Sequence, residues 1–170
     1  MRTQAVHEIV AALKEQGVNF VVSLPDVPDS ILIRTLTQDP AFKTVIVTNE
    51  GEGVALAAGS WLGGKKPTVI INSAGLLVAT WSLANTGMFY GIPLLLLCPY
   101  RGDIGDRSRV RGGYLRIFKL TVEPLLQTLQ IPHRVVARIE DLRDAIRDAQ
   151  HTAATTEIPV ALLLTGEVLW

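Results

Sequence analysis

Apolar residues along the chain follow two spacings, and each spacing predicts one kind of element. Near the N-terminus they recur at intervals of three and four residues, which is the period of one helix face. Thr3 can cap this first helix and Gly17 can end it. The later apolar runs are short, and most end at Pro, Gly, Asn or Asp, as β-strands do. The residues of the helical set are Val6, Ile9, Val10 and Leu13.

Six short apolar runs predict six β-strands with helices between them. The expected strands cover residues 18–24, 43–48, 67–72, 93–98, 133–137 and 159–164. After the first helix, the expected helices cover residues 31–36, capped by Asp29 or Ser30, then 54–62, 76–88, 122–129 and 141–155. Strands that are apolar on both faces are typical of a covered parallel sheet. We therefore expect an α/β fold, doubly wound, with a six-stranded, mainly parallel sheet and helices on both faces, in a single domain over residues 1–170.

The composition narrows the possible functions. Of the 170 residues 48% are hydrophobic, and 16 basic residues balance 16 acidic ones to a formal charge of zero. No global field then attracts nucleic acid or an anionic membrane, and no apolar run reaches the roughly 18 residues of a membrane span. The single Cys98 lies in an apolar run, which indicates a buried thiol in a reducing compartment. We expect a cytoplasmic protein that binds neither nucleic acid nor membrane.

Glu50 is the residue whose position most needs an explanation. It follows an apolar strand and precedes an Ala-rich helix, at the kind of junction where parallel α/β sheets bind ligands. A first-turn acid that only complements the helix dipole is the simplest explanation, and it is what we expect of Glu52. A carboxylate with a chemical role is the alternative.

Several common motifs are absent. Gly51 and Gly53 begin a dinucleotide-binding pattern, but Leu56 stands where the third glycine is required. Gly63-Gly64-Lys65 lacks the first glycine and the hydroxyl residue of a phosphate loop. The three histidines are far apart in the sequence and show no metal-ligand spacing, so no metal site is expected in this chain.

Four stretches occur in one order along the chain, and with the closing pairs Ile131-Pro132 and Pro159-Val160 they span nearly all of it. They run from Gly17 to Asp26, from Thr48 to Gly59, from Asn72 to Leu76 and from Gly91 to Gly102. Their key sequences are Gly-Val-Asn-Phe with Pro-Asp, Thr-Asn-Glu-Gly-Glu with Ala-Ala-Gly, Asn-Ser-Ala-Gly-Leu, and Gly-Ile-Pro-Leu with Tyr-Arg-Gly. In this order they resemble the pyrimidine-binding domain of thiamine-diphosphate enzymes. Within that superfamily the chain is similar to the small α subunit of sulfopyruvate or phosphonopyruvate decarboxylases.

The resemblance implies a thiamine diphosphate site at one edge of the sheet. Glu50 takes the place of the cofactor-activating, catalytic glutamate, whose carboxyl group hydrogen-bonds a ring nitrogen of the aminopyrimidine and favours its imino tautomer. From the residues alone, Pro25-Asp26 also fits an ordinary strand-ending turn, and Ser73 also fits a helix cap. The cofactor-binding residues implied by the resemblance are Glu50, Pro25, Asp26, Ser73, Ala74 and Gly75.

The segment from Tyr100 to Gly113 is long for a connection in a compact domain and is rich in arginine. Guanidinium groups bind oxyanions through several donors, so this segment is a candidate for binding a sulfonate or phosphonate. A solvated charged loop is the alternative explanation. The candidate substrate-binding residues are Arg101, Arg107 and Arg109.

The resemblance also implies a partner chain. Enzymes of this kind hold the diphosphate through a bivalent metal bound by a Gly-Asp-Gly motif in a separate domain, and Gly102-Asp103-Ile104 breaks that motif. We therefore expect a β subunit that supplies the Mg²⁺ and diphosphate site, in a hetero-oligomer. The expected reaction is decarboxylation of a small 2-oxo acid, sulfopyruvate first and phosphonopyruvate second. A carboligase or oxidoreductase half with the same cofactor and a non-catalytic α/β interaction module stay open as alternatives.

Overall fold

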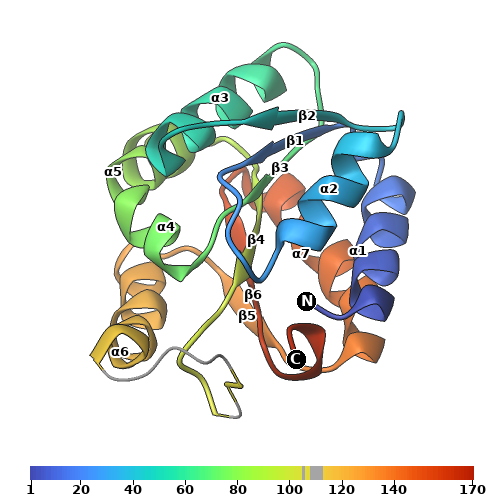
Figure 1. Ribbon diagram of the computed structural model, residues 1–170. Coiled ribbons are helices and arrows are strands. Elements are labelled where there is room, and N and C mark those ends of the chain that lie inside the picture. Colours follow the sequence, from blue (N-terminus) through green and yellow to red (C-terminus); the bar gives the residue numbers. More distant parts are fainter. Residues whose placement is uncertain (105, 108–112) are drawn as a thin grey trace.

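The computed structural model describes residues 1–104, 106–107 and 113–170, which form a six-stranded sheet between two layers of helices (Figure 1). The strands are β1 (Phe20–Ser23), β2 (Lys43–Ile46), β3 (Pro67–Ile70), β4 (Leu95–Pro99), β5 (His133–Val136) and β6 (Val160–Leu164). Their order is β2-β1-β3-β4-β6-β5, and each neighbouring pair is parallel. The prediction of a doubly wound, parallel α/β sheet is confirmed.

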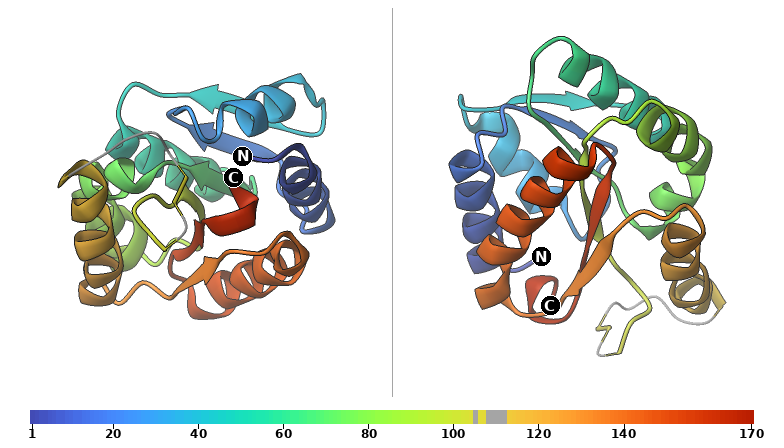
Figure 2. Two further views of the ribbon diagram at one scale, coloured as in Figure 1. Left: turned by 60° about the horizontal axis from the view of Figure 1, so that its bottom comes forward. Right: turned by 180° about the vertical axis from the view of Figure 1, so that it is seen from behind.

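Two helical layers cover the two faces of the sheet, as the views in Figure 2 also show. Helices α1 (Thr3–Glu15), α2 (Ser30–Gln38) and α7 (Leu142–Thr156) pack into one apolar core. Helices α3 (Glu50–Leu62), α4 (Ser73–Val78) and α6 (Gly113–Thr128) pack into the other, together with the π-helix η1 (Leu83–Phe89). The short helix α5 (Thr80–Ser82) packs beside α3 and contributes no buried residue. Short 3₁₀ helices, η2 (Ile139–Asp141) and η3 (Gly166–Val168), flank α7 and β6. No helix of the described residues is long and apolar enough to cross a bilayer.

The ends of the first helix show which local signals were informative. Gly17 has a φ of 70°, and the N–H groups of Gly17 and Val18 bond back to the last turn, so glycine ends α1 as predicted. Thr3 is not the N-cap, because Arg2 occupies that position and Thr3 is already helical. Asp29 does stand at the N-cap of α2, but its side chain makes no capping bond.

Three predicted elements differ from the structure. The helix expected at 76–88 begins at Ser73, because Asn72 accepts the N–H of Gly75, and it is divided into α4, α5 and η1. The helix expected at 122–129 begins at Gly113, with Phe118 buried one turn before Val122. Strand β2 is an edge strand rather than a fully buried one, and Ile46 at its end is 52% exposed.

Candidate functional site

The segments that follow four neighbouring strands meet at one edge of the sheet. Strands β2, β1, β3 and β4 are adjacent and parallel, so their carboxyl ends share that edge. The chain order reverses between β1 and β3, since β2 lies beyond β1 and β4 lies beyond β3. Ligands of doubly wound sheets bind in the crevice at such a reversal. The residues predicted from the sequence at Asp26, Glu50, Ser73 and Arg101 all follow these four strands.

Glu50 and Gly75 are brought into direct contact. Glu50 is the first residue of α3. Asn49 caps the N-terminus of this helix, since its Oδ1 accepts the N–H groups of Gly51 at 2.9 Å and Glu52 at 3.2 Å. A Cβ built on Gly75 would lie 2.8 Å from Cγ of Glu50 and 3.0 Å from its Oε1. The half-buried Glu50 side chain therefore lies over Gly75, in space that any other residue at 75 would fill.

Asp26 and Asn72 join the two sides of the strand reversal. The Asn72 Nδ2 donates to Asp26 Oδ2 at 2.9 Å, while the N–H of Val27 donates to Asp26 Oδ1 at 2.7 Å. Asn72 Oδ1 accepts the N–H of Gly75 at 2.8 Å, which places the start of α4 relative to β1. The resemblance placed Asn72 in the turn expected to line the aminopyrimidine pocket, but Asn72 was not among the cofactor-binding residues singled out there, although a polar residue directly after a buried strand was a usable signal.

Arg101 is turned inward and paired with Asp26. Its Nη2 lies 3.1 Å from Asp26 Oδ2, the residue is only 9% exposed, and its buried Nε has no hydrogen-bond partner among the described residues. The Arg101 N–H donates to Ser73 Oγ, and that hydroxyl donates to the Pro99 carbonyl oxygen. Ser73 is thus buried beneath the site, where it fastens α4 to the end of β4. A guanidinium with an unused donor is consistent with an anion beside it.

The remaining predicted site residues are more dispersed. Pro25 is exposed and Ala74 is half-buried, each next to a member of the network described above. Arg107 is exposed. Arg109 lies outside the described residues, so its predicted role stays a prediction.

Asp29 is a buried carboxyl group behind Asp26, and sequence reasoning gave it only a capping role. Its Oδ1 accepts the N–H of Asp26 at 2.8 Å, while its Oδ2 is buried and has no hydrogen-bond partner in the described part of the chain. Burial raises the pKa of Asp29 to about 6, against the smaller lowering effect of the Asp26 N–H. No sequence signal distinguished Asp29 from a surface turn acid, because its burial arises from the way the turn folds back on itself.

We expect Asp29→Asn to remove a pH dependence of stability. The pKa rises on folding from 3.8 to about 6, so between these values the folded chain holds a proton that the unfolded chain has lost. Unfolding free energy therefore falls as pH rises through this window, by at most about 3 kcal/mol, and Asn cannot contribute this term. In urea titrations at pH 4 and pH 7, the free energy of unfolding of the variant should increase relative to that of the parent at the higher pH.

Asp39→Asn is the matched control for that experiment, because the bond from Lys14 lowers the pKa of Asp39. The stabilisation from Asp39 is lost only as pH falls below 3.8, so the difference between Asp39→Asn and the parent should change little from pH 4 to pH 7, and any change should have the opposite sign. Equal differences between parent and Asp29→Asn at both pH values would contradict the prediction.

A second polar cluster fastens the segment after β4 to α6. The Tyr100 hydroxyl donates to Glu123 Oε1 at 2.7 Å, and Lys119 Nζ donates to the same oxygen at 2.8 Å. Lys119 also pairs with Asp103 at 2.9 Å and lies 5.4 Å from the centroid of the Tyr100 ring. These bonds lower the pKa of Glu123, chiefly through Lys119. The cluster fixes the position of the backbone on either side of Arg101.

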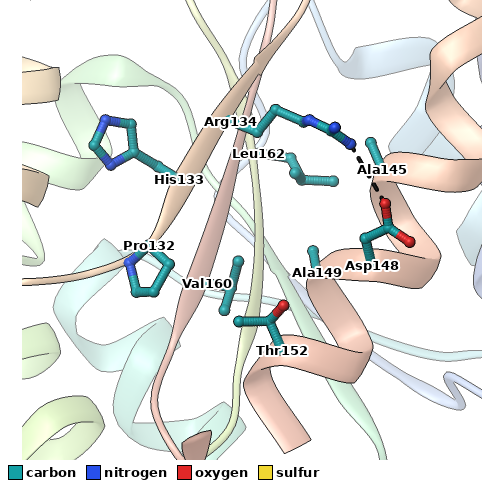
Figure 3. A pocket seen from close by; sticks show the side chains of 9 residues that line it. All are labelled: Pro132, His133, Arg134, Ala145, Asp148, Ala149, Thr152, Val160 and Leu162. Carbon is teal, nitrogen blue, oxygen red and sulfur yellow. Dashed lines mark ion pairs between the residues drawn. The ribbon is translucent and has the colours of Figure 1, made fainter. Parts of the chain in front are cut away.

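Features elsewhere in the described residues were compared with this site. Among the described residues, no group of three or more His, Cys, Asp or Glu side chains is arranged to hold a metal ion. A shallow pocket lies between α7 and strands β5 and β6, where Arg134 reaches toward Asp148 at 3.6 Å (Figure 3). No residue predicted for the site lines that pocket. Cys98 is fully buried, which raises the pKa of its thiol and makes it a poor nucleophile at neutral pH.

Comparison with known proteins places the site within one family of domains. Residues 3–109 match the model of the thiamine pyrophosphate enzyme, N-terminal TPP binding domain. This stretch contains Asp26, Glu50, Asn72 and Arg101, so the whole network lies inside the matched region.

Individual relatives agree with that match. The sulfopyruvate decarboxylase subunit alpha of Methanococcus maripaludis is 28% identical over 94% of this chain and 93% of its own length. The phosphonopyruvate decarboxylase of Streptomyces viridochromogenes is 35% identical over 95% of this chain, which spans 40% of that protein. Among solved structures, benzoylformate decarboxylase from Polynucleobacter necessarius superposes with a TM-score of 0.76 at 24% identity, and this chain covers 31% of it. The structural likeness concerns the fold alone.

Proposed function

Because the chain belongs to the thiamine pyrophosphate enzyme family through that family's N-terminal TPP-binding domain, we propose that it is the α subunit of a heteromeric, thiamine-diphosphate-dependent 2-oxo acid decarboxylase. Sulfopyruvate is the first candidate substrate and phosphonopyruvate the second, following the names of the relatives. The contact between Glu50 and Gly75 at the strand reversal is the observation that carries this proposal. We also propose that residues 1–170 form a single pyrimidine-binding domain, and that the complex is cytoplasmic.

The residues at the sheet edge fit the flat aminopyrimidine half of the cofactor. Gly75 keeps the space beneath the Glu50 side chain free, and the half-buried Ala74 beside it is also small. Small residues let the backbone approach a planar ring closely. Among the described residues there is no cluster for a metal ion. We therefore assign the Mg²⁺ and diphosphate site to a partner β subunit, consistent with relatives of equal length that are named as alpha subunits.

Glu50 is the proposed catalytic residue. When bound, thiamine diphosphate supplies the electron sink that allows a 2-oxo acid to lose carbon dioxide. Glu50 would share a proton with a ring nitrogen of the aminopyrimidine, which needs a short contact in a site closed to water. Packing against Gly75 would hold the carboxyl group in one place.

Arg101 is the proposed group for the second anionic end of the substrate. Asp26 holds the guanidinium by one nitrogen, and the buried Nε remains to be satisfied. A sulfonate or phosphonate offers three oxygens to such a donor. Asp26, itself fixed by Asn72 and the Val27 N–H, then serves to orient Arg101 as well as to face the cofactor.

Reconstitution tests the function directly. The chain is co-expressed with a candidate β subunit that carries a Gly-Asp-Gly motif, and carbon dioxide release is measured with sulfopyruvate, phosphonopyruvate and pyruvate, each with and without an aldehyde acceptor. Decarboxylation of one of the two dianionic acids is expected. Carbon–carbon bond formation with the acceptor would instead favour a carboligase half. A complex that binds cofactor but turns over none of the acids would contradict the proposal.

Arg101→Met should weaken the binding of the dianionic acid selectively. Loss of a hydrogen-bonded charge from a buried site typically costs about tenfold to a hundredfold in affinity, so KM for that acid should rise by this factor. The kcat/KM for pyruvate, which lacks the second anion, should change less than about threefold. Steady-state kinetics on both acids provide the measurement.

Arg34→Met is the control for this substitution, because Arg34 is exposed on α2 in the opposite helical layer. It should leave both KM values unchanged. An equal loss with both acids in Arg101→Met would show that Arg101 supports the site without contacting the second anion.

A further inference from the structure

One helical layer of the molecule has an exposed face with almost no charge. The sequence contains no Asp, Glu, Lys or Arg from residue 67 to residue 100, and none from residue 53 to residue 64. Large apolar side chains of α3 and of the α4–η1 segment are nevertheless exposed, with Trp81 at 75% and Phe89 at 79%. We call these residues the uncharged face, and they are Leu56, Trp61, Leu62, Val78, Trp81, Phe89 and Tyr90.

The opposite layer has the surface of a solvated protein. There α1 and α7 are linked by Arg143, which pairs with Glu8 and Glu15, and α7 carries further ion pairs of Arg147. Among the described residues of this layer's helices, the only exposed large apolar residue is Ile31 of α2, at 45%. The two layers cover the two faces of the same sheet. A general tolerance of exposed apolar groups therefore does not explain the difference between their exposed surfaces. Several exposed large apolar residues gathered on one helical layer are typical of a binding surface.

The uncharged face begins beside the candidate site. Helices α3 and α5 pack together, and a Cβ on Gly51 would lie 3.0 Å from Oγ of Ser82. Gly51 follows Glu50, and Ser82 follows the exposed Trp81. Whatever covers Trp81 therefore lies next to the start of α3, where the Glu50 side chain rests on Gly75.

We propose that the uncharged face binds the partner subunit that completes the cofactor site, an inference that rests on the proposed function. The partner must reach the Glu50 edge, and this face continues from that edge. A second copy of this chain would cover the apolar groups, but it would bring only another site without a metal cluster among its described residues. A membrane surface is disfavoured because the helices that carry the face have no Lys or Arg to meet anionic headgroups. The partner should present an apolar, uncharged surface in return.

Trp81→Glu and Phe89→Glu test the inference in the co-expressed complex. Each places an unpaired carboxylate where the proposed contact excludes water, and aromatic residues are typical anchors of such contacts. We expect the Kd for the β subunit, measured by biolayer interferometry, to rise at least about thirtyfold for each variant. Both residues are mostly exposed, so circular dichroism and thermal melting of the free chain should be unchanged.

His7→Glu, on the exposed side of α1, is the matched control and should bind within about twofold of the parent. Unchanged partner affinity in Trp81→Glu and Phe89→Glu, or a parent chain that binds no β subunit, would overturn the inference. So would self-association or vesicle binding that these variants abolish while partner binding persists.

The inference and the proposed function can fail separately. A complex that forms through the uncharged face but decarboxylates neither acid would contradict the proposed function and support the proposed interface. If Trp81→Glu retains both turnover and normal affinity for the β subunit, the proposed interface is contradicted and the proposed function is supported.

Discussion

Glu50→Gln is expected to reduce decarboxylation by the reconstituted complex at least about a hundredfold in kcat, within the range typical of lost acid–base groups. The amide has nearly the same size but cannot share an acidic proton with a ring nitrogen. Asn49 would still cap α3, and Gly75 would still leave space for the side chain, so the fold and partner affinity should be retained. The measurement is kcat with cofactor at saturation, together with a thermal melt.

Glu52→Gln is the matched control for Glu50. It removes an acid from the same first turn of α3, so both variants lose the same favourable interaction with the helix dipole. Glu52 is exposed, and its side chain lies 3.5 Å from the Thr48 hydroxyl rather than over Gly75. Near-normal turnover in Glu50→Gln, or equal losses in both variants, would be incompatible with the proposed role.

Gly75→Ala is expected to lower kcat about a hundredfold through displacement of Glu50. The added Cβ would lie 2.8 Å from Cγ of Glu50 and 3.1 Å from Cβ of Ile71. The Glu50 side chain is the more mobile of the two neighbours and must swing away, and misplacement of a catalytic group by about 1 Å can cost a hundredfold in rate. Stability should change little, because alanine is the better helix former and partly offsets the strain.

Two comparisons separate this mechanism from general damage. Gly59→Ala, on the exposed side of α3, has no atom within 4 Å of the new Cβ, and it should stabilise the chain by about 0.5–1 kcal/mol with normal activity. In a Glu50→Gln background, Gly75→Ala should cause little further loss, because both changes act through the same carboxyl group. Fully additive losses in the double variant would show that Gly75 acts on something other than Glu50.

The elements were well predicted where a local pattern was sufficient. Short apolar runs located all six strands, and the alternation with helices was correct. Predictions failed where distant contacts decide. The division of the fourth helical segment, with Gly87 so close to Pro159 that a Cβ would lie 2.6 Å from its Cγ, cannot be read from residues 76–88. The partial exposure of β2 follows from its place at the sheet edge, which strand order alone decides.

Some residues of the candidate site could likewise be predicted from the sequence, and others could not. Family resemblance singled out Glu50, Asp26 and Gly75, and these residues do lie at one edge of the sheet. Asn72 was placed only in the turn expected to line the pocket, and Asp29 only at a helix cap. The bond of Asn72 to a residue 46 positions away and the burial of Asp29 within its turn depend on the folded chain. Arg101 was proposed as a substrate-binding residue, but its pairing with Asp26 across 75 positions was not foreseeable.

By itself the sequence determined that a carboxylate starts an Ala-rich helix after a short strand, in a chain of alternating helices and strands without a Gly-Asp-Gly metal motif. Periodicity and composition are local properties, and they were sufficient to predict these features. Only the tertiary structure decided that Gly75 lies beneath Glu50, that Asp26 and Asn72 bond across the strand reversal, and that Arg101 turns inward. These contacts depend on strand order and register, which arise when separate segments pack their apolar faces together and which no single segment encodes.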